Sequence, residues 1–281
     1  MKILIFGSSG QLGKALSREL KNHNLVLVNK KKCDIKNTIK LKQIIKKINP
    51  NLLINAAAYT NVDKAEKNKQ EALKINCFAP KIMAEEAKNL NIPFLHFSTD
   101  FVFDGRRQYY SERCKKNPIN FYGISKSRGE EEITKIGGHY FIFRTSWVYS
   151  NERSNFYLTI KEKVRNKKDL FVVKDQKSIP TPSIFLAKKI KEIIPHLFEL
   201  KKSGIYHLTP NGECSKINFA KIIVKKVNPK YSIKNILPIS SKELFDHGVK
   251  RPKNSVLKNN KIKETFNLKI QTWQYYFEKY F

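Results

Sequence analysis

The chain has 281 residues, of which 41% are hydrophobic, and its 55 lysines and arginines outnumber its 24 aspartates and glutamates to give a formal net charge of +31. This hydrophobic share can build a buried core, which excludes a disordered polyelectrolyte. No apolar run approaches the ~18 residues that span a bilayer, and the apolar run over 1–6 is too short for a signal peptide. The length suits one large domain or two coupled ones.

The cysteines lie far apart, and no Cys-x-x-Cys pair occurs. This spacing indicates free thiols in a reducing compartment and disfavours a zinc site or a disulfide framework. We therefore expect a cytoplasmic protein with no membrane partner. The residues concerned are Cys33, Cys77, Cys114 and Cys214.

The positive charge comes mostly from lysines that are scattered along the whole chain. The longest basic run is Lys30–Lys32, and arginine, the better residue for bidentate recognition of phosphates and bases, is scarce. The positive field attracts anionic ligands such as nucleotides and phosphorylated sugars. The distribution favours a lysine-rich solvated surface over a nucleic-acid or membrane footprint.

Short apolar runs alternate with helical patterns through about residue 150. This alternation predicts an α/β fold with a Rossmann-type, doubly wound parallel sheet and helices on both faces. Strands are predicted over 3–6, 25–28, 52–54, 94–97 and 140–143. Helices are predicted over 12–20, 39–48, 72–90 (interrupted or started afresh near Pro80) and 121–133.

Beyond residue 150 the rhythm is less regular and prolines cluster. Strands are predicted over 170–173 and 205–208, a helix over 217–227, and the aromatic cluster Trp273–Phe277 as the packing face of a last helix. We expect a Rossmann domain over 1–150 and a smaller C-terminal α+β lobe over 151–281. The boundary is approximate, and some segments are expected to return to the sheet.

The first predicted strand runs into a G-x-x-G-x-x-G turn and then a helix, the context of a dinucleotide-binding turn. Gly7 allows the tight turn, Gly10 lets a pyrophosphate approach the backbone, and Gly13 lets helix and strand pack closely. The helix N-terminus then offers free N–H groups to the phosphates. The alternative is a plain glycine-rich turn.

The end of the second strand bears on the choice of cofactor. An NAD site usually places Asp or Glu there to hold the ribose 2′-hydroxyl, whereas this strand ends with Val28, Asn29 and Lys30–Lys32. Cationic residues suit a 2′-phosphate, so we expect NADPH, with NADH as the alternative. Asp34 follows the lysines, where it can sit near the adenine.

Tyr122 and Lys126 form a Y-x-x-x-K pair, which places both side chains on one helix face, one turn apart. A nearby ammonium favours the phenolate and lowers the tyrosine pKa, so that the phenol can exchange a proton with a carbonyl oxygen. Thr99 ends the fourth predicted strand, where open α/β sheets bind ligands, and can hydrogen-bond the same oxygen. Alone, the Y-x-x-x-K spacing is common and mostly structural.

With these features the chain resembles the extended short-chain dehydrogenase/reductase superfamily and, more narrowly, the dTDP-4-dehydrorhamnose reductase family. The matching segments keep the family's order and cover nearly the whole chain. They are Gly7–Gly13, Ile54–Glu66, Ser98–Gly105, Tyr122–Lys126 with Gly129 and Glu130, Arg144–Tyr149, Asp175 and Gln176 with Pro180 and Thr181, Gly204–His207, and Arg251–Leu257.

The resemblance implies that Tyr122 is the general acid, Lys126 its partner and a ribose ligand, and Thr99 the third member of the triad. The cofactor site is expected to comprise Gly7, Gly10, Gln11, Leu12, Gly13, Asn29, Lys30, Asp34, Ile35, Ala56, Ala57, Ala58, Thr60, Tyr122 and Lys126. The substrate site is expected to comprise Thr60, Val62, Thr99, Phe101, Tyr122, Trp147, Arg251 and Asn254. Three of these residues have alternative roles. Trp147 can be an ordinary core residue, and Arg251 can form a surface ion pair. Arg251 and Asn254 can instead hold the lobe in place.

The chain departs from the family at three places. Phe101 stands where the family usually has a tyrosine. The usual glycine after Gln176 is missing, since Lys177–Ile179 lie between Gln176 and Pro180. Some members bind magnesium at a dimer interface through a glutamate of the first helix, where this chain has Lys14–Leu16. We expect no such metal, and the segment leaves a homodimer open.

The implied function is NADPH-dependent reduction of the 4-keto group of a nucleotide-activated 6-deoxyhexose, foremost dTDP-4-dehydro-L-rhamnose to dTDP-L-rhamnose. One alternative is the same reduction on a UDP-4-keto-6-deoxy sugar. Another is a non-catalytic, NADP-binding regulatory subunit, since a regulatory subunit of methionine adenosyltransferase also resembles this family. A nucleic-acid binder is disfavoured because no recognised motif of that kind occurs.

Three further residues are expected to have structural and not catalytic roles. Asp63 and Glu66 are spaced as a helix start with its capping acid rather than as paired catalytic carboxylates. His96 alternates with apolar neighbours on a predicted strand, so we expect a core histidine, not a ligand.

Overall fold

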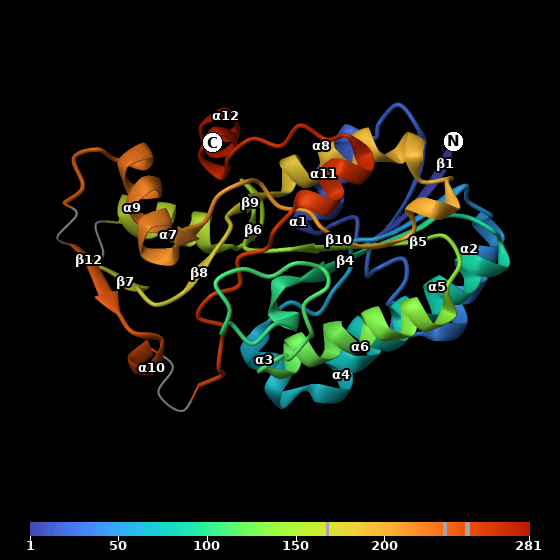
Figure 1. Cartoon of the computed structure of the whole chain (residues 1–281), viewed down its shortest axis with the longest axis horizontal. Coiled ribbons are helices and arrows are strands. Elements are labelled where there is room, and N and C mark those ends of the chain that lie inside the picture. The colour runs from blue at the N-terminus through green and yellow to red at the C-terminus, as the bar shows by residue number, and fades with distance from the viewer. Residues whose placement is uncertain (167–168, 233–234, 245–247) are drawn as a thin grey trace.

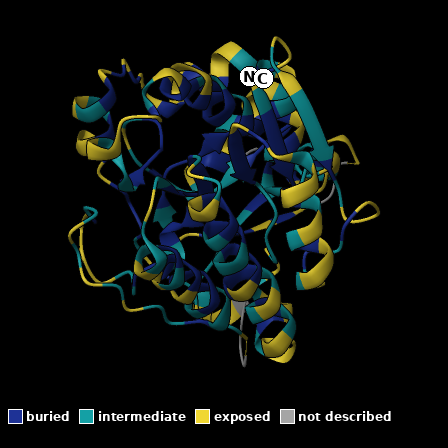
Figure 2. Ribbon diagram, turned by 90° about the vertical axis from the view of Figure 1, so that its right-hand side faces the viewer, coloured by how far each residue is buried: buried dark blue, intermediate teal, exposed yellow. Residues whose placement is uncertain are grey.

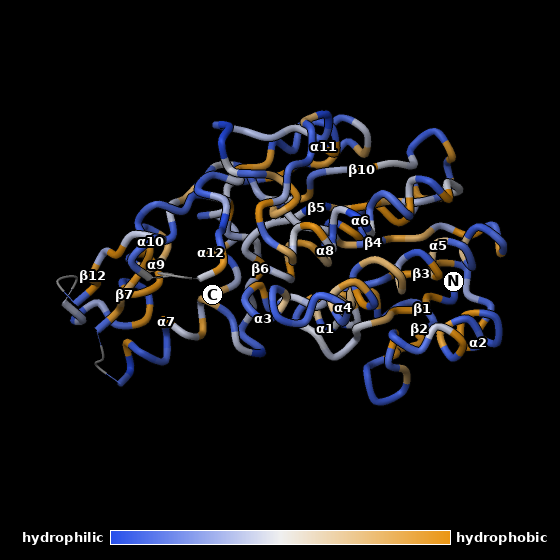
Figure 3. Tube along the Cα trace, turned by 90° about the horizontal axis from the view of Figure 1, so that it is seen from below, coloured by the Kyte–Doolittle hydropathy of each residue, from blue (hydrophilic) through white to orange (hydrophobic). Residues whose placement is uncertain are grey.

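Six parallel strands form the central sheet, in the order β10-β5-β4-β3-β1-β2. The computed structural model describes residues 1–166, 169–232, 235–244 and 248–281. Figure 3 shows the six strands side by side in this order. The predicted parallel Rossmann-type sheet is confirmed, and all its neighbouring strands pair in parallel. The strands are β1 (Lys2–Phe6), β2 (Asn24–Val28), β3 (Leu52–Asn55), β4 (Phe94–Thr99), β5 (Tyr140–Thr145) and β10 (Gly204–His207).

Helices cover both faces of the sheet because successive side chains of a strand point to opposite sides. Ile3 and Ile5 pack into one buried cluster, whereas Leu4 and Phe6 pack into another. Figure 2 shows the strands as a dark-blue layer between helices with exposed outer faces. No helix in the described ranges is both long and apolar enough to cross a membrane. One face carries α1 (Gln11–Glu19), α8 (Ser183–Ile193) and α11 (Asn260–Phe266), and the other α2 (Thr38–Ile48), α5 (Ala79–Asn89) and α6 (Phe121–Ile136) (Figure 1).

The helix predicted over 72–90 is continuous but irregular. It consists of α4 (Lys69–Leu73), a π-helical turn over Lys74–Phe78, and α5, and it follows the short helix α3 (Val62–Lys67). Pro80 lies in the first turn of α5, where a missing N–H costs little. The interruption or restart that the sequence predicts near Pro80 takes the form of a change from π-helical to α-helical turns, without a break in the helix.

The strand order places a topological switch point at β1. This strand pairs with β2 on one side and with β3 on the other. In open α/β sheets, ligands bind at the carboxyl ends of the strands that flank such a point. Gly7 follows β1 and Ala56 follows β3, so both predicted cofactor segments lie there.

A second core of buried aromatic residues holds the smaller lobe, which Figure 1 shows beside the carboxyl ends of the sheet. Trp273 and Phe277 of the last helix pack into this core, which confirms the packing face predicted for that helix. The remaining elements are β6 (Val148–Tyr149), α7 (Phe156–Arg165), β7 (Leu170–Val173), β8 (Lys177–Ser178), β9 (Thr181–Pro182), β11 (Cys214–Ser215), α9 (Lys216–Val227), β12 (Ile236–Ile239), α10 (Ser241–Leu244) and α12 (Trp273–Tyr280).

Segments from the second half of the chain return to the large sheet. The strand predicted over 205–208 is β10, which pairs with β5 and extends the sheet. Helices α8 and α11 pack on the same sheet. The cluster that contains Ile3 and Ile5 includes residues from both halves of the chain. The division into two lobes at residue 150 therefore stays a prediction.

Candidate active site

The turn after β1 is shaped for close backbone approach. Gly7 has a φ of +79°, and a Cβ atom there would lie 2.5 Å from the backbone nitrogen of Ala57, so only glycine fits. Gly10 precedes α1, and no side chain caps that helix. Its first N–H groups therefore remain available to an anion, as a pyrophosphate requires.

A cavity of about 640 Å³ opens at the carboxyl ends of the strands. Every predicted cofactor residue except Gly13 lines it. A Cβ atom on Gly13 would lie 2.2 Å from the carbonyl oxygen of Gly7, so this glycine allows α1 to pack against the turn. The residues present thus fit a bound dinucleotide.

The three lysines after β2 do not share one environment. Asn29 and Lys30 line the cavity, and Lys31 and Lys32 do not. The Nζ of Lys32 instead donates to the carbonyl oxygen of Leu27 at 3.2 Å. Only Lys30 of this run is therefore placed to meet a 2′-phosphate.

Thr99, Tyr122 and Lys126 all line the cavity, from the end of β4 and the first turns of α6. Asn120 caps α6, its side-chain oxygen accepting from the N–H of Gly123 at 2.8 Å. A Cβ atom on Gly123 would lie 2.2 Å from the carbonyl oxygen of Phe101. This glycine therefore lets the helix that carries Tyr122 approach the turn after β4.

The pKa of Tyr122 differs from the expectation. Burial raises the pKa of Tyr122 to about 12, and a hydrogen bond with Thr99 offsets this only in part. The ammonium of Lys126 was expected to lower it, but the Nζ lies 2.6 Å from the carbonyl oxygen of Phe97 and 3.0 Å from Nε2 of His96. The predicted lowering is wrong, because the Nζ of Lys126 contacts Phe97 and His96 instead of the phenol.

The expected sugar-pocket residues lie at different depths. Thr60 and Trp147 line the cavity, and the ring of Phe101 meets that of Tyr122 edge-on at a centroid distance of 5.8 Å. Trp147 has a φ of +39°, an unusual conformation for a bulky residue, directly after β5. Val62 begins α3 and does not line the cavity.

The two expected residues of the C-terminal segment make contacts across the fold. Nη2 of Arg251 donates to both carboxylate oxygens of Asp63 of α3, at 2.9 and 2.8 Å. Asn254 donates to the carbonyl oxygen of Gln108 at 3.0 Å and accepts from the N–H of Val256 at 3.2 Å. The amide nitrogen of Asn254 thus contacts the segment that contains Gln108, and its amide oxygen stabilises the turn toward Val256.

The capping interpretation of Asp63 and Glu66 is wrong in its detail. Helix α3 does start here, but Asn61 caps it. The Oε1 of Glu66 accepts from the N–H of Phe121 at 2.6 Å and so satisfies the start of α6 instead. Asp63 is free to pair with Arg251. The two acids therefore connect α3 to two other segments.

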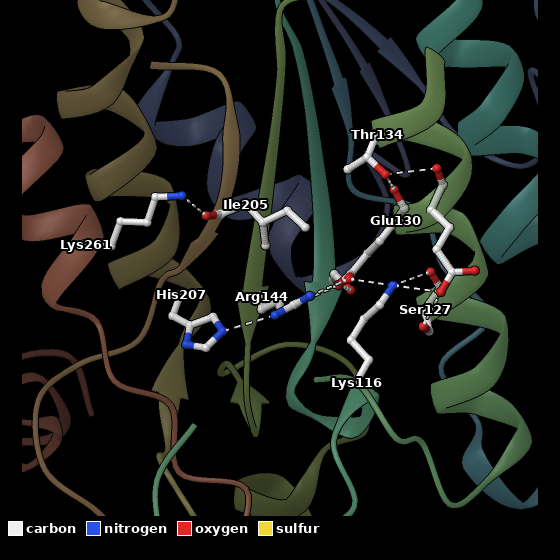
Figure 4. A network of polar contacts seen from close by, with 10 residues as sticks. Lys116, Ser127, Glu130, Thr134, Arg144, Ile205, His207 and Lys261 are labelled. Atoms are coloured by element: carbon white, nitrogen blue, oxygen red, sulfur yellow. Dashed lines mark hydrogen bonds and ion pairs between the residues drawn. The ribbon is translucent and has the colours of Figure 1, made fainter. Parts of the chain in front are cut away.

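A buried ion pair connects α6, the helix that carries Tyr122 and Lys126, to β5, and the sequence did not predict it. Nε and Nη2 of Arg144 donate to the two oxygens of Glu130 at 2.9 and 2.7 Å (Figure 4). Burial alone would raise the pKa of Glu130, but Arg144 outweighs it and the pKa is lowered. Ser98 of β4 donates to the same carboxylate at 2.5 Å. This network fixes α6 against β4 and β5.

A second buried acid joins the two halves of the chain. Oδ2 of Asp100 accepts from Ser178 at 3.1 Å and from Ser255, and Oδ1 accepts from Thr99 at 3.1 Å. Burial raises the pKa of Asp100 to about 6, although these hydrogen bonds oppose the rise. The end of β4, and with it Thr99, is therefore tied to the smaller lobe.

A cation of α9 was also missed. The Nζ of Lys216 lies 5.4 Å from the ring centroid of Trp147 and 3.4 Å from the side-chain oxygen of Gln176. In the described part of the chain no carboxylate forms an ion pair with it. Burial and the charge of Arg251 lower the pKa of Lys216 to about 8. No local sequence pattern predicts these contacts of Lys216, because Trp147 and Gln176 come from distant segments of the chain.

Comparison with known proteins decides the family. A family model described as the RmlD substrate binding domain matches residues 1–281. The chain belongs to this family. It is accordingly an NAD(P)H-dependent oxidoreductase, as the resemblance in its sequence implied.

Individual relatives agree over nearly their whole lengths. The chain is 33% identical to a dTDP-4-dehydrorhamnose reductase from Burkholderia thailandensis, over 98% of this chain and 96% of the relative. It is 34% identical to the spore coat polysaccharide biosynthesis protein SpsK from Bacillus subtilis, over 94% and 91%. The crystal structure of dTDP-4-dehydrorhamnose reductase from Bacillus anthracis in complex with NADP has a TM-score of 0.92 at 33% identity, over 99% and 98% of the two chains.

Proposed function

We propose that the chain reduces the 4-keto group of dTDP-4-dehydro-L-rhamnose with NADPH to give dTDP-L-rhamnose. The observation that carries the proposal is the shared cavity: Thr99, Tyr122 and Lys126 line the same space as the glycine-rich turn. The names of the relatives support the nucleotide sugar, and the NADP complex of the Bacillus anthracis enzyme supports the cofactor.

NADPH, when bound, supplies the hydride that reduces the ketone. The turn at Gly7 and Gly10 would hold its pyrophosphate, and Lys30 its 2′-phosphate. Ala56–Ala58 and Thr60 would line the nicotinamide half, with Lys126 at the adjoining ribose.

Tyr122 acts as the general acid, giving its phenolic proton to the sugar oxygen as negative charge develops there. Its raised pKa keeps the phenol protonated at neutral pH, which a proton donor requires. The hydroxyl of Thr99 turns from Asp100 to the substrate and donates a hydrogen bond to the same oxygen, and a protonated Lys126 stabilises the phenolate that remains. Trp147 and Phe101 exclude water from the reacting centre.

We propose that Lys216 and Arg251 bind the diphosphate of the substrate. Lys216 lacks an ion-pair partner among the described residues and lies over the indole of Trp147, which lines the cavity. Arg251 is close enough to Lys216 to lower its pKa. Two cations at one place outside the cofactor site suit a diphosphate.

The test follows NADPH absorbance with dTDP-4-dehydro-L-rhamnose and, in parallel, with its UDP analogue. Oxidation of NADPH with the dTDP sugar is the expected result. Faster turnover of the UDP sugar would replace the assigned nucleotide. If neither sugar is consumed although NADPH binds, the regulatory-subunit alternative takes the place of this proposal.

A further inference from the structure

A chain of buried polar groups lies behind Lys126, outside the triad. The Nζ of Lys126 is 3.0 Å from Nε2 of His96, and Nδ1 of His96 is 3.1 Å from the side-chain nitrogen of Asn55. The side-chain oxygen of Asn55 accepts from the N–H of Ala57 at 3.0 Å. His96, Asn55 and Lys126 are all buried, so water cannot replace these contacts.

The hydrogen bonds fix the tautomer of His96. The backbone N–H of Ala57 can only donate, so the side-chain oxygen of Asn55 must face it. The amide NH₂ of Asn55 therefore points at Nδ1 of His96, which has to accept. Burial holds the pKa of His96 well below its usual value, so the ring is neutral. Its single proton is consequently on Nε2.

This tautomer conflicts with an ammonium on Lys126. An ammonium only donates, so at 3.0 Å two donors would face each other. A neutral amine accepts from Nε2–H through its lone pair and still donates to the carbonyl oxygen of Phe97 at 2.6 Å. All four groups are then satisfied.

The carboxylate of Glu130 favours an ammonium on Lys126, but burial outweighs its effect. Glu130, on the same helix, is committed to Arg144 of β5 and Ser98 of β4. Lys126 forms no ion pair within the described ranges. Burial lowers the pKa of Lys126 to about 8, against the charge of Glu130, so a modest bias decides its protonation. Tyr122 is protonated, and Asp100 faces the serines of the smaller lobe.

We propose that His96 is a positioning residue that donates Nε2–H to Lys126 and holds this lysine as a neutral amine in the cofactor-free enzyme. His96 thereby sets the pH above which Lys126 is without its proton, and with it the alkaline limit of turnover. The consequence for turnover rests on the proposed function, whereas the protonation states themselves do not.

The tautomer is measured directly by ¹⁵N NMR of histidine-labelled, cofactor-free protein, with His96→Phe to assign the resonance among the six histidines. We expect the Nε2–H tautomer, and an Nδ1–H tautomer overturns the proposal. In the same protein, the ¹³Cε resonance of Lys126, assigned with Lys126→Arg, reports the titration of the lysine. Its pKa is expected to rise by about one unit in His96→Phe. An unchanged titration overturns the proposal as well.

The third readout is the pH profile of kcat/KM for NADPH, because this ratio reports the groups of the cofactor-free enzyme. His96→Phe is expected to move the alkaline limb to higher pH, and a merely structural loss would lower the rate without moving the limb. His139→Phe, at the start of β5 and outside this set of contacts, is the control. If His96→Phe does not fold, His96→Gln serves, because its amide oxygen can accept from an ammonium. If the enzyme turns over neither sugar, the two NMR measurements still decide the protonation states.

Discussion

The carboxylate of Glu130 and the guanidinium of Arg144 pair through two hydrogen bonds, at 2.9 and 2.7 Å, with both side chains buried. The pair connects the helix that carries Tyr122 and Lys126 to the strand that leads to Trp147. Nη1 of Arg144 also lies 3.5 Å from Nε2 of His207 on β10 (Figure 4). The catalytic helix is thus fixed by charge as well as by packing.

Arg144→Met is expected to lower the free energy of unfolding by about 3–5 kcal/mol, because it leaves a buried, uncompensated carboxylate. Urea denaturation measures the change. Lys116→Met is the control: its Nζ lies farther away, 3.6 Å from Glu130, and the lysine is partly exposed, so we expect a smaller loss of about 0–1 kcal/mol. The double variant Glu130→Leu, Arg144→Met should recover much of the loss. If Arg144→Met alone is as stable as the wild type, the pair does not hold the helix.

Tyr122→Phe is expected to lower kcat about 10²–10⁴-fold, because the proton donor is lost while the ring remains. The dissociation constant for NADPH should stay within a few-fold of the wild type, as measured by fluorescence titration. Thr99→Val should cost less, about 10-fold, since it removes a hydrogen bond and not the proton. Near-normal turnover by Tyr122→Phe would assign the acid elsewhere.

Lys30→Met is expected to raise KM for NADPH about 10–100-fold and to leave KM for NADH nearly unchanged, because only NADPH carries the 2′-phosphate. Lys32→Met is the matched control, since that lysine donates to the carbonyl oxygen of Leu27 and does not line the cavity. Steady-state kinetics with both cofactors separates the two variants. Equal effects of Lys30→Met on NADPH and NADH would remove Lys30 from the phosphate site.

Much of this fold is predictable from short-range patterns. Apolar runs and helical spacing locate the strands and helices, and the glycine turn and the Tyr122–Lys126 spacing predict the cofactor site and the acid that we propose. The predictions fail where contacts join distant segments. The hydrogen-bond partners of Asp100 lie 78 and 155 residues away along the chain. The apolar run 205–208 likewise predicts a strand but does not show that this strand joins the central sheet. Local spacing shows which face is buried but not what lies against it.

His96 illustrates the same limit within the site. Its alternation with apolar neighbours predicts burial, and burial is confirmed. The contacts with Lys126 and Asn55 depend on the pairing of β3 with β4 and on the placement of α6, which no local pattern reports. The expected role, a core histidine, therefore omits the contacts with Lys126 and Asn55.

Lys216→Met is expected to raise KM for the nucleotide sugar about 10-fold with little change in kcat, because a diphosphate contact is retained from substrate to transition state. Lys221→Met, on the same helix, is the control, and it should leave KM unchanged. Trp147 offers a second measurement: dTDP is expected to change its fluorescence in the wild type but less in Lys216→Met. If KM is unaffected while turnover persists, the diphosphate lies elsewhere.

Asp100→Asn tests the buried acid through the pH dependence of stability. The folded-state pKa of Asp100 is about 6, above its ordinary value of 3.8, so the folded protein binds a proton more tightly than the unfolded chain does. Stability from this group is therefore present below about pH 4 and is lost as the pH rises to 6. A two-unit difference corresponds to about 3 kcal/mol.

Asparagine cannot ionise, so the variant lacks this loss. Melting temperatures of wild type and Asp100→Asn, compared at pH 5 and pH 8, should differ in one direction: the variant gains relative to the wild type at the higher pH. Taking the difference between the two proteins cancels the titration of every other group. Ser178→Ala is the control for a lost hydrogen bond, because it removes a donor at 3.1 Å that favours the ionised carboxylate. In this variant the loss of stability between pH 5 and pH 8 should be larger than in the wild type. A constant difference between Asp100→Asn and wild type at both pH values would mean that Asp100 titrates as an ordinary carboxyl group and that its burial costs nothing.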